Sequence, residues 1–229
     1  MSLLEVAAVV LLGTLVGLDV ASVPQAMFSR PLVAGTLGGV VVGEPLAGLA
    51  VGALLELFAI DTLPVGATRN PDWGPGSVAV GALAGAHHSG ILASALLGLV
   101  MVAVLSAWAG GLLVHLVRRA NVLAVASRRA ALDAGDPAAI LAVQRRGLLR
   151  DAARSMALTA FALGIGDVVS ALFGHRWGAG QAAATLALAA TSLGAAGLVG
   201  WRLGGAGWRR LWFAGGLGAG GVVASLWLR

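Results

Sequence analysis

Cysteine, lysine and tyrosine are absent from this chain of 229 residues, and charged residues of every kind are scarce. Without cysteine the chain forms no disulfide, and it offers neither a thiolate nucleophile nor a sulfur ligand to a metal. Only 11% of its residues are charged, whereas a soluble domain carries about 25%. The chain therefore has less than half of the charge that a water-facing surface requires.

Apolar and small residues take the place of the missing charge. Hydrophobic residues make up 59% of the chain, and 35 glycines are interspersed among alanine, leucine and valine. Because these glycines lie inside long apolar runs, the composition argues against a disordered glycine-rich chain. It favours helices that pack closely in lipid, where contact between backbones replaces the hydrophobic effect. We predict an all-α integral membrane protein, a polytopic helical bundle in which residues 1–229 form a single membrane domain.

Signatures of catalysis are missing as well. The chain has no G-x-S-x-G element, no Walker motif and no G-x-G-x-x-G phosphate cradle, so covalent catalysis and an ATP-driven step have little support. His87 and His88 are adjacent, and on a helix they would point about 100° apart instead of sharing one face as metal ligands do. A packed or helix-terminal pair is favoured, and we expect no catalytic residue, no metal and no cofactor. An intramembrane hydrolase with paired carboxylates is a minor alternative, for which no water-activating metal cluster is visible.

The positive charge is concentrated in one stretch between apolar blocks. Eight of the arginines lie there: Arg118, Arg119, Arg128, Arg129, Arg145, Arg146, Arg150 and Arg154. Such a cluster places its segment in the cytoplasm by the positive-inside rule, and it argues against nucleic acid as the partner of a chain with net charge +5. Within the stretch, Asp136 and Pro137 are suited to the cap and the first residue of a helix. We divide the chain into N-terminal spans with a re-entrant site region (1–117), a cytoplasmic amphipathic segment (118–154) and C-terminal spans (155–229).

Apolar runs of about 20 residues are needed to cross a bilayer as a helix. Five runs meet this length: Leu3–Val23, Gly90–Val117, Met156–Phe173, Ala179–Trp201 and Leu211–Leu228. Two others, Pro31–Gly43 and Leu46–Ile60, are too short and are separated by Glu44 and Pro45. They predict half-helices or a re-entrant hairpin, which transporters use to build a substrate site. The stretch Asp61–Gly76, rich in proline and glycine, cannot be a continuous helix.

Glu56 is the clearest candidate for a functional side chain, because it lies inside an apolar run with no cation within one helical turn. Ionisable residues inside a membrane are a functional hypothesis by default. Such a carboxylate must be protonated, paired, or directed toward a polar cavity. The alternative is a structural role, in which Glu56 bonds the broken backbone of the neighbouring half-helix.

Asp61, Asn70 and Asp72 follow in the irregular stretch, and Trp73 lies beside them. Carboxylates and an amide bind sugar hydroxyls well, usually beside an aromatic face, which Trp73 would supply. The alternative is a solvated loop in which the aspartates and the asparagine satisfy turns and Trp73 anchors the membrane interface. Asp19 and Asp167, at span ends or within spans, are weaker candidates for a direct role.

A series of short motifs between Arg30 and Asp72 carries a resemblance to a known family. In order they are Arg30-Pro31, Gly43-Glu44, Leu55-Glu56, Val65-Gly66-Ala67 and Pro71-Asp72. In order and spacing this stretch resembles the IIC subunit of the mannose/fructose/sorbose family of the bacterial phosphotransferase system (PTS). The rest of the chain agrees with that family in its pattern of spans only.

The resemblance implies a permease subunit of the bacterial cytoplasmic (inner) membrane, one that is not itself an enzyme. It would translocate a sugar (hexose or amino sugar) by an elevator-like movement together with a IID membrane subunit, as an oligomer of IIC–IID pairs. Cytoplasmic IIA and IIB proteins would pass the phosphoryl group to the sugar. By motif match, Glu56 and Asp72 are expected to bind the substrate, and Gly66 to let the backbone approach it. The alternative function is a non-transporting membrane scaffold or sensor in an incomplete PTS.

Overall fold

The computed structural model describes residues 1–20, 22–23, 25–60, 62, 70–87, 93–176, 189, 193 and 209–227. Every regular element within these ranges is a helix, as the composition predicts. The helices are α1 (Leu3–Leu18), α2 (Pro31–Val41), α3 (Pro45–Ala59), α4 (Gly74–Ala86), α5 (Ala93–Ala126), α6 (Arg129–Asp133), α7 (Pro137–Arg176) and α9 (Arg209–Trp227). The predicted span Ala179–Trp201 lies outside the described residues, apart from two isolated positions.

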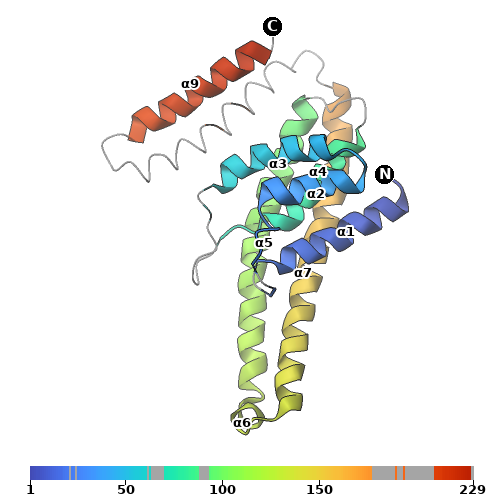
Figure 1. Ribbon diagram of the computed structural model, residues 1–229, viewed down its shortest axis with the longest axis vertical. Coiled ribbons are helices and arrows are strands. Elements are labelled where there is room, and N and C mark those ends of the chain that lie inside the picture. The colour runs from blue at the N-terminus through green and yellow to red at the C-terminus, as the bar shows by residue number, and fades with distance from the viewer. Residues whose placement is uncertain are drawn as a thin grey trace.

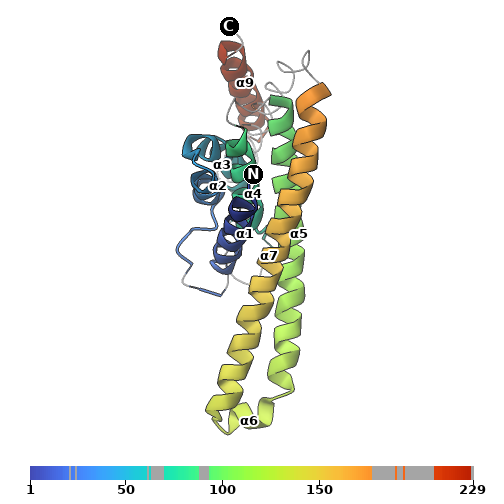
Figure 2. The same ribbon diagram turned by 90° about the vertical axis from the view of Figure 1, so that its right-hand side faces the viewer.

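Helices α1 to α4 are short and pack beside the long pair α5 and α7, which run next to each other (Figures 1 and 2). With 34 and 40 residues, the two long helices measure about 50 and 60 Å at 1.5 Å per residue. Their segments Ala95–Ala126 and Pro137–Phe173 are long and apolar enough to cross a membrane. Because a bilayer core is about 30 Å thick, the pair extends well beyond one. In Figure 1 its free end, at α6, projects away from the short helices.

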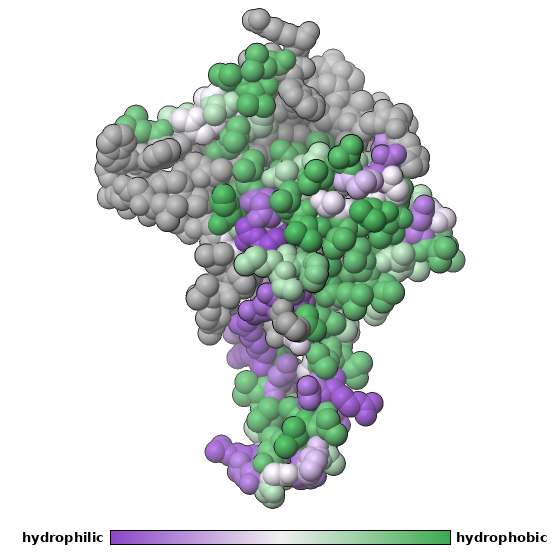
Figure 3. Space-filling model, in the orientation of Figure 1, coloured by the Kyte–Doolittle hydropathy of each residue, from purple (hydrophilic) through white to green (hydrophobic). Residues whose placement is uncertain are grey.

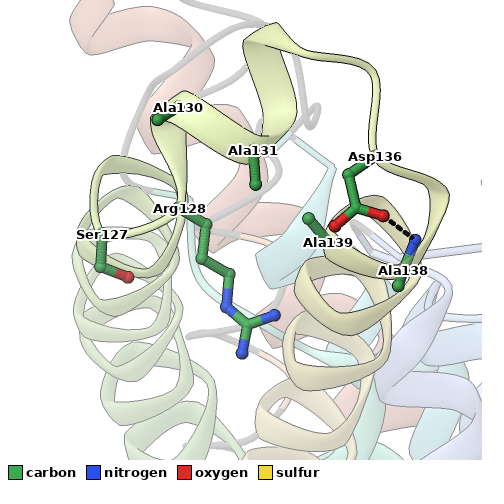
Figure 4. A pocket seen from close by; sticks show the side chains of 7 residues that line it. All are labelled: Ser127, Arg128, Ala130, Ala131, Asp136, Ala138 and Ala139. Carbon is green, nitrogen blue, oxygen red and sulfur yellow. Dashed lines mark hydrogen bonds between the residues drawn. The ribbon is translucent and has the colours of Figure 1, made fainter.

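The segment 118–154 is helical on both sides of the break expected at Gly135-Asp136-Pro137, but its helices are not confined to that segment. Instead α5 continues through it to Ala126, and α7 begins at Pro137. The predicted break is confirmed: Gly135 has a φ of +72°, and the Ala138 N–H donates to the Asp136 carboxylate at 2.9 Å. Figure 4 shows this capped turn, with the Arg128 side chain extending into the space between the two helix ends.

The length of the apolar run predicts a helix that reaches Val23, but helix α1 ends at Leu18. The cause is Asp19, whose carboxylate accepts hydrogen bonds from the backbone N–H groups of Ala26 at 2.7 Å and Ser29 at 3.2 Å. These bonds turn the chain back toward the start of α2. At 16 residues the helix is about 24 Å long.

The two short helices predicted around Glu44 and Pro45 are confirmed. Helices α2 and α3 form a hairpin that turns at Gly43, whose φ of +81° favours glycine. The helices approach to backbone contact: a Cβ atom added at Gly48 would lie 2.3 Å from the Gly35 carbonyl oxygen, and one added at Gly81 of α4 would lie 2.2 Å from the same oxygen. Helix α4 is buried from Gly74 to Gly85 and is the centre of the fold.

The outward faces of these helices are apolar. Leu11 of α1, Leu105 of α5 and Phe161 of α7 are all at least 60% exposed. In Figure 3 hydrophobic side chains cover much of the described face, and hydrophilic ones recur along the projecting part of the α5–α7 pair. Such an exposed apolar belt suits contact with lipid, because lipid leaves no water to make the exposure costly.

Candidate functional site

A cavity of about 320 Å³ lies where the α1–α2 loop meets the segment before α4. Its volume falls in the range of about 300–1,000 Å³ that is typical of small-molecule sites. The lining residues come from three parts of the chain: Asp19, Val20, Gln25, Met27, Ser29, Arg30 and Pro31, then Thr62, and then Asn70, Pro71 and Trp73. More than half of them carry polar side chains, within a fold whose exterior is apolar.

Asp19 organises the loop that forms one wall of this cavity. Its side chain is buried, with 3% exposed. Besides the hydrogen bonds from the Ala26 and Ser29 backbone N–H groups, its carboxylate accepts one from the Ser29 hydroxyl at 3.4 Å. Three hydrogen-bond donors therefore surround the carboxylate. Asp19 lines the cavity, and its charge is compensated by the loop that it holds.

Arg30 and Glu56 form an ion pair at the base of the α2–α3 hairpin. The Arg30 Nε atom donates to Glu56 Oε1 at 2.7 Å, and a terminal guanidinium nitrogen donates to the same oxygen. The other terminal nitrogen donates to the Thr62 carbonyl oxygen at 3.3 Å, and the Leu32 N–H donates to Glu56 Oε2 at 3.1 Å. Arg30 lines the cavity, whereas Glu56 lies behind it.

Glu56 is paired and bonds the neighbouring half-helix, as the structural alternative predicts, and its functional role stays a prediction. Its carboxylate is paired with a cation, and it also bonds a backbone N–H in the first turn of the neighbouring short helix, at Leu32. The predicted absence of a nearby cation applies only within the helix, because Arg30 precedes Glu56 by 26 positions. Sequence reasoning named Arg30 as part of a motif but missed this pairing.

Trp73 lies against the cavity and is only 8% exposed. Its indole N–H donates to the Thr62 hydroxyl oxygen at 2.9 Å, and that hydroxyl donates to the Ala59 carbonyl oxygen at 2.8 Å. This chain of bonds ties the segment before α4 to the end of α3. Of the two roles considered for Trp73, its location favours the cavity over the membrane interface.

Asp72 points away from the cavity, into a buried network with helix α7. Its carboxylate accepts a hydrogen bond from Arg154, whose Nε atom donates to Asp151 at 2.8 Å. The same guanidinium donates to the Gly17 carbonyl oxygen at 3.2 Å, and the Ser22 hydroxyl donates to Asp151 at 2.5 Å. Counting Arg154 among the cytoplasmic loop arginines is therefore a wrong prediction: it is 5% exposed and paired with two acids.

The five predicted site residues divide into three groups. Asn70 lines the cavity, whereas Glu56 and Asp72 are held behind its wall by arginines. Gly66 and Asp61 lie outside the described residues. Among the residues that sequence reasoning missed, Thr62 and Asp151 carry no local signal, because each acts through partners distant in the sequence.

Among the described residues, no three histidine or acidic side chains are grouped together. His87 ends helix α4, as expected for a helix-terminal residue, and His88 is not among the described residues.

The family described as the sorbose-specific IIC component of the PTS, EII-Sor, matches residues 3–199. The mannose-specific EIIC components of Escherichia coli (strain K12) and Shigella flexneri are each 32% identical to this chain over 127 residues. That alignment covers 56% of this chain and 46% of each relative. The chain thus spans about half the length of the curated relatives it matches.

Two solved structures resemble the fold. One, described as a membrane protein, has a TM-score of 0.71 and 23% identity over 93% of this chain and 85% of the other. The second comes from the complex of the mannose transporter ManYZ with microcin E492, with a TM-score of 0.59 and 24% identity over 100% and 94% of the two chains. At these identities the likeness concerns the fold alone, and it confirms the predicted all-α membrane architecture.

Proposed function

Because the chain belongs to the family of sorbose-specific IIC components of the PTS, we propose that it carries a sugar across the bacterial inner membrane. The observation that supports this most is the cavity between the α1–α2 loop and the segment before α4, whose wall includes several polar side chains. Polar groups within an apolar helical fold are where a membrane protein would bind a hydroxyl-rich solute. The mannose-specific relatives make mannose the natural first probe.

The chemistry of the cavity suits a hexose or an amino sugar. Sugar hydroxyls both donate and accept hydrogen bonds, and the wall offers the Arg30 guanidinium, the Asn70 amide and the Thr62 hydroxyl, with Trp73 as the apolar surface. The charges of Asp19 and Arg30 are each compensated by protein groups. Binding a neutral sugar such as a hexose therefore leaves no buried charge without a partner.

In this proposal Arg30 contacts the sugar, and Glu56 acts by holding Arg30 in place. This assigns Glu56 a different part from the direct contact expected by motif match. Gly66 stays a candidate contact through the motif match, and Asp61 stays one as a carboxylate of the irregular stretch.

Transport requires partners and movement beyond what one cavity provides. We propose a IID membrane subunit as the partner, in an oligomer of IIC–IID pairs, with IIA and IIB proteins supplying the phosphoryl group from the cytoplasm. The free end of the α5–α7 pair would face the cytoplasm, because seven of the eight clustered arginines lie along its projecting part. In an elevator-like movement, the part of the fold that carries the cavity would move as one body against a static part of the assembly.

The proposal is tested by measuring mannose binding and uptake in membranes that contain the full chain and its IID partner. Replacing Arg30→Gln removes a charged hydrogen-bond donor from the cavity, a loss of about 1.5–3 kcal/mol, which is about 10- to 150-fold in affinity. Glu56→Gln keeps the Arg30 guanidinium in the cavity but removes the charge that holds it in place. We therefore expect a smaller loss of mannose affinity than for Arg30→Gln. Arg146→Gln, on the exposed surface of α7, is the matched control and is expected to bind like the wild type.

The outcomes separate the competing functions. Failure of the wild-type chain to bind any hexose or amino sugar contradicts a transport function. Sugar binding without uptake favours the scaffold or sensor. Wild-type affinity in the Arg30→Gln variant shows that the sugar binds elsewhere.

A further inference from the structure

Behind the cavity, one guanidinium connects three segments of the chain. The three nitrogens of Arg154 donate to three separate acceptors: Asp72 before α4, Asp151 on α7 itself, and the Gly17 carbonyl oxygen in the last turn of α1. Asp151 in turn accepts from Ser22 in the α1–α2 loop. Both walls of the cavity are thereby attached to helix α7 at the same point.

We propose that Arg154 is the positioning residue of the cavity, which fixes the α1–α2 loop and the segment 70–73 to α7 and so sets the affinity for the sugar. This inference rests on the proposed function, because it assigns Arg154 a part in sugar binding. Arg154 does not line the cavity, so it acts only through the residues that it holds.

The geometry shows how the attachment reaches the cavity wall. Asp72 lies between Pro71 and Trp73, which both line the cavity. Its carboxylate is bound to α7, and its backbone N–H donates to the Ala107 carbonyl oxygen of α5 at 2.8 Å. The chain is thus held on both sides at this residue, which leaves its two neighbours in a defined position.

The second wall is held in a similar way. Asp19 and Val20, which line the cavity, come directly after the turn of α1 that contains Gly17. A Cβ atom added at Gly17 would lie 2.2 Å from the Ser155 hydroxyl oxygen, so α1 and α7 are in close contact here. Such packing leaves little room for the loop to shift while Arg154 is in place.

A lysine at position 154 could not make all three of these hydrogen bonds. The planar guanidinium donates in three directions at once, whereas an ammonium group is a compact point charge on a flexible stem. Because Arg154, Asp72 and Asp151 are each at most 5% exposed, removing the guanidinium leaves two buried carboxylates without their cation, which is costly. A lysine would preserve the charge but not all three attachments.

Arg150 provides a matched control for a purely structural role. It lies one turn before Arg154 on α7 and also joins helices, with hydrogen bonds to the Ala120 carbonyl oxygen at 3.1 Å and the Asn121 side chain at 2.9 Å. Neither partner belongs to the cavity wall. Its replacement therefore weakens the α5–α7 contact without releasing a cavity segment.

The test compares Arg154→Lys, Arg154→Gln and Arg150→Gln in the full chain with its IID partner, with radiolabelled mannose as the probe. Kd is measured on the monodisperse, folded fraction, because a role in folding alone would lower the yield without changing Kd. We expect Kd to rise about tenfold or more for Arg154→Gln, the loss typical of one charge-assisted hydrogen bond. We expect a smaller rise for Arg154→Lys and none for Arg150→Gln. Wild-type Kd in folded Arg154→Gln, or an equal rise in Arg150→Gln, overturns the inference.

A second measurement does not depend on sugar binding. The chain has no cysteine, so Gln25→Cys places a single thiol in the cavity wall, and its rate of labelling by a maleimide reports the position of the loop. Adding Arg154→Lys is expected to change that rate several-fold, and adding Arg150→Gln is not. If the rates agree in all three proteins, the positioning role is refuted even where the wild type binds mannose. If the rates differ but no sugar binds, the proposed function fails and the positioning role stands.

Discussion

The contact between α2 and α4 permits a quantitative prediction for Gly81→Ala. The added methyl carbon would lie 2.2 Å from the Gly35 carbonyl oxygen and 2.8 Å from the Gly35 Cα and carbonyl carbon. All three atoms belong to the backbone, so no side chain can rotate away, and the helices must separate by about 1 Å to reach ordinary carbon contact distances. Moving α2 outward presses Gly35 on Gly52 of α3, because a Cβ atom at Gly35 would already lie 2.9 Å from the Gly52 Cα.

The expected loss of stability follows from these distances. Overpacking a close-packed interior costs about 1–3 kcal/mol, and a shift of backbone against backbone places Gly81→Ala at the upper end of that range. The higher helix propensity of alanine offsets at most about 1 kcal/mol of this loss of stability. We therefore expect the free energy of unfolding to fall by about 2 kcal/mol, the difference of these two estimates.

Gly164→Ala is the matched control, because Gly164 is an exposed glycine of α7 at which an added Cβ atom meets no other atom within 4 Å. It is expected to raise stability slightly, through helix propensity. The assay is reversible unfolding of both variants in mixed detergent micelles, followed by circular dichroism. Equal stability of Gly81→Ala and Gly164→Ala would refute the view that α2 and α4 are in backbone contact.

Two further predictions address the cavity wall and the end of the long helices. Trp73→Phe removes the hydrogen bond to Thr62 but keeps an aromatic ring, so mannose affinity is expected to fall about fivefold, the loss of one neutral hydrogen bond of about 1 kcal/mol; an unchanged Kd would show that this bond does not shape the cavity. Asp136→Ala removes the cap of α7 and is expected to lower stability by about 0.5–2 kcal/mol, seen as faster amide exchange at residues 137–140, while mannose affinity stays at the wild-type value.

Most of the architecture followed from local properties of the sequence. The scarcity of charge predicted an all-α membrane fold, and Glu44-Pro45 predicted the hairpin of short helices. The continuity of α5 was missed because its arginines suggested a separate amphipathic segment. A signal was available, since Ala93–Ala126 contains no proline, the residue that most strongly ends a helix.

The candidate site was less predictable, because its pairings are distant in sequence. Glu56 and Asp72 were recognised as unusual, yet their arginine partners lie 26 and 82 positions away. Local patterns show that a buried acid requires compensation, but not which residue provides it. Asn70 is predicted to bind sugar hydroxyls through its amide, and the structure shows that it lines the cavity.

The broken arrangement of the short helices has an electrostatic consequence for these two acids. The Glu56 side chain, from the last turn of α3, accepts a hydrogen bond from the Leu32 N–H in the first turn of α2. Asp72 precedes α4 by two residues. The aligned peptide dipoles give the beginning of a helix a partial positive charge, which stabilises a nearby anion. A continuous span would have its ends only at the membrane surfaces. By beginning helices inside the fold, the chain obtains positive potential for its buried carboxylates without adding further cations.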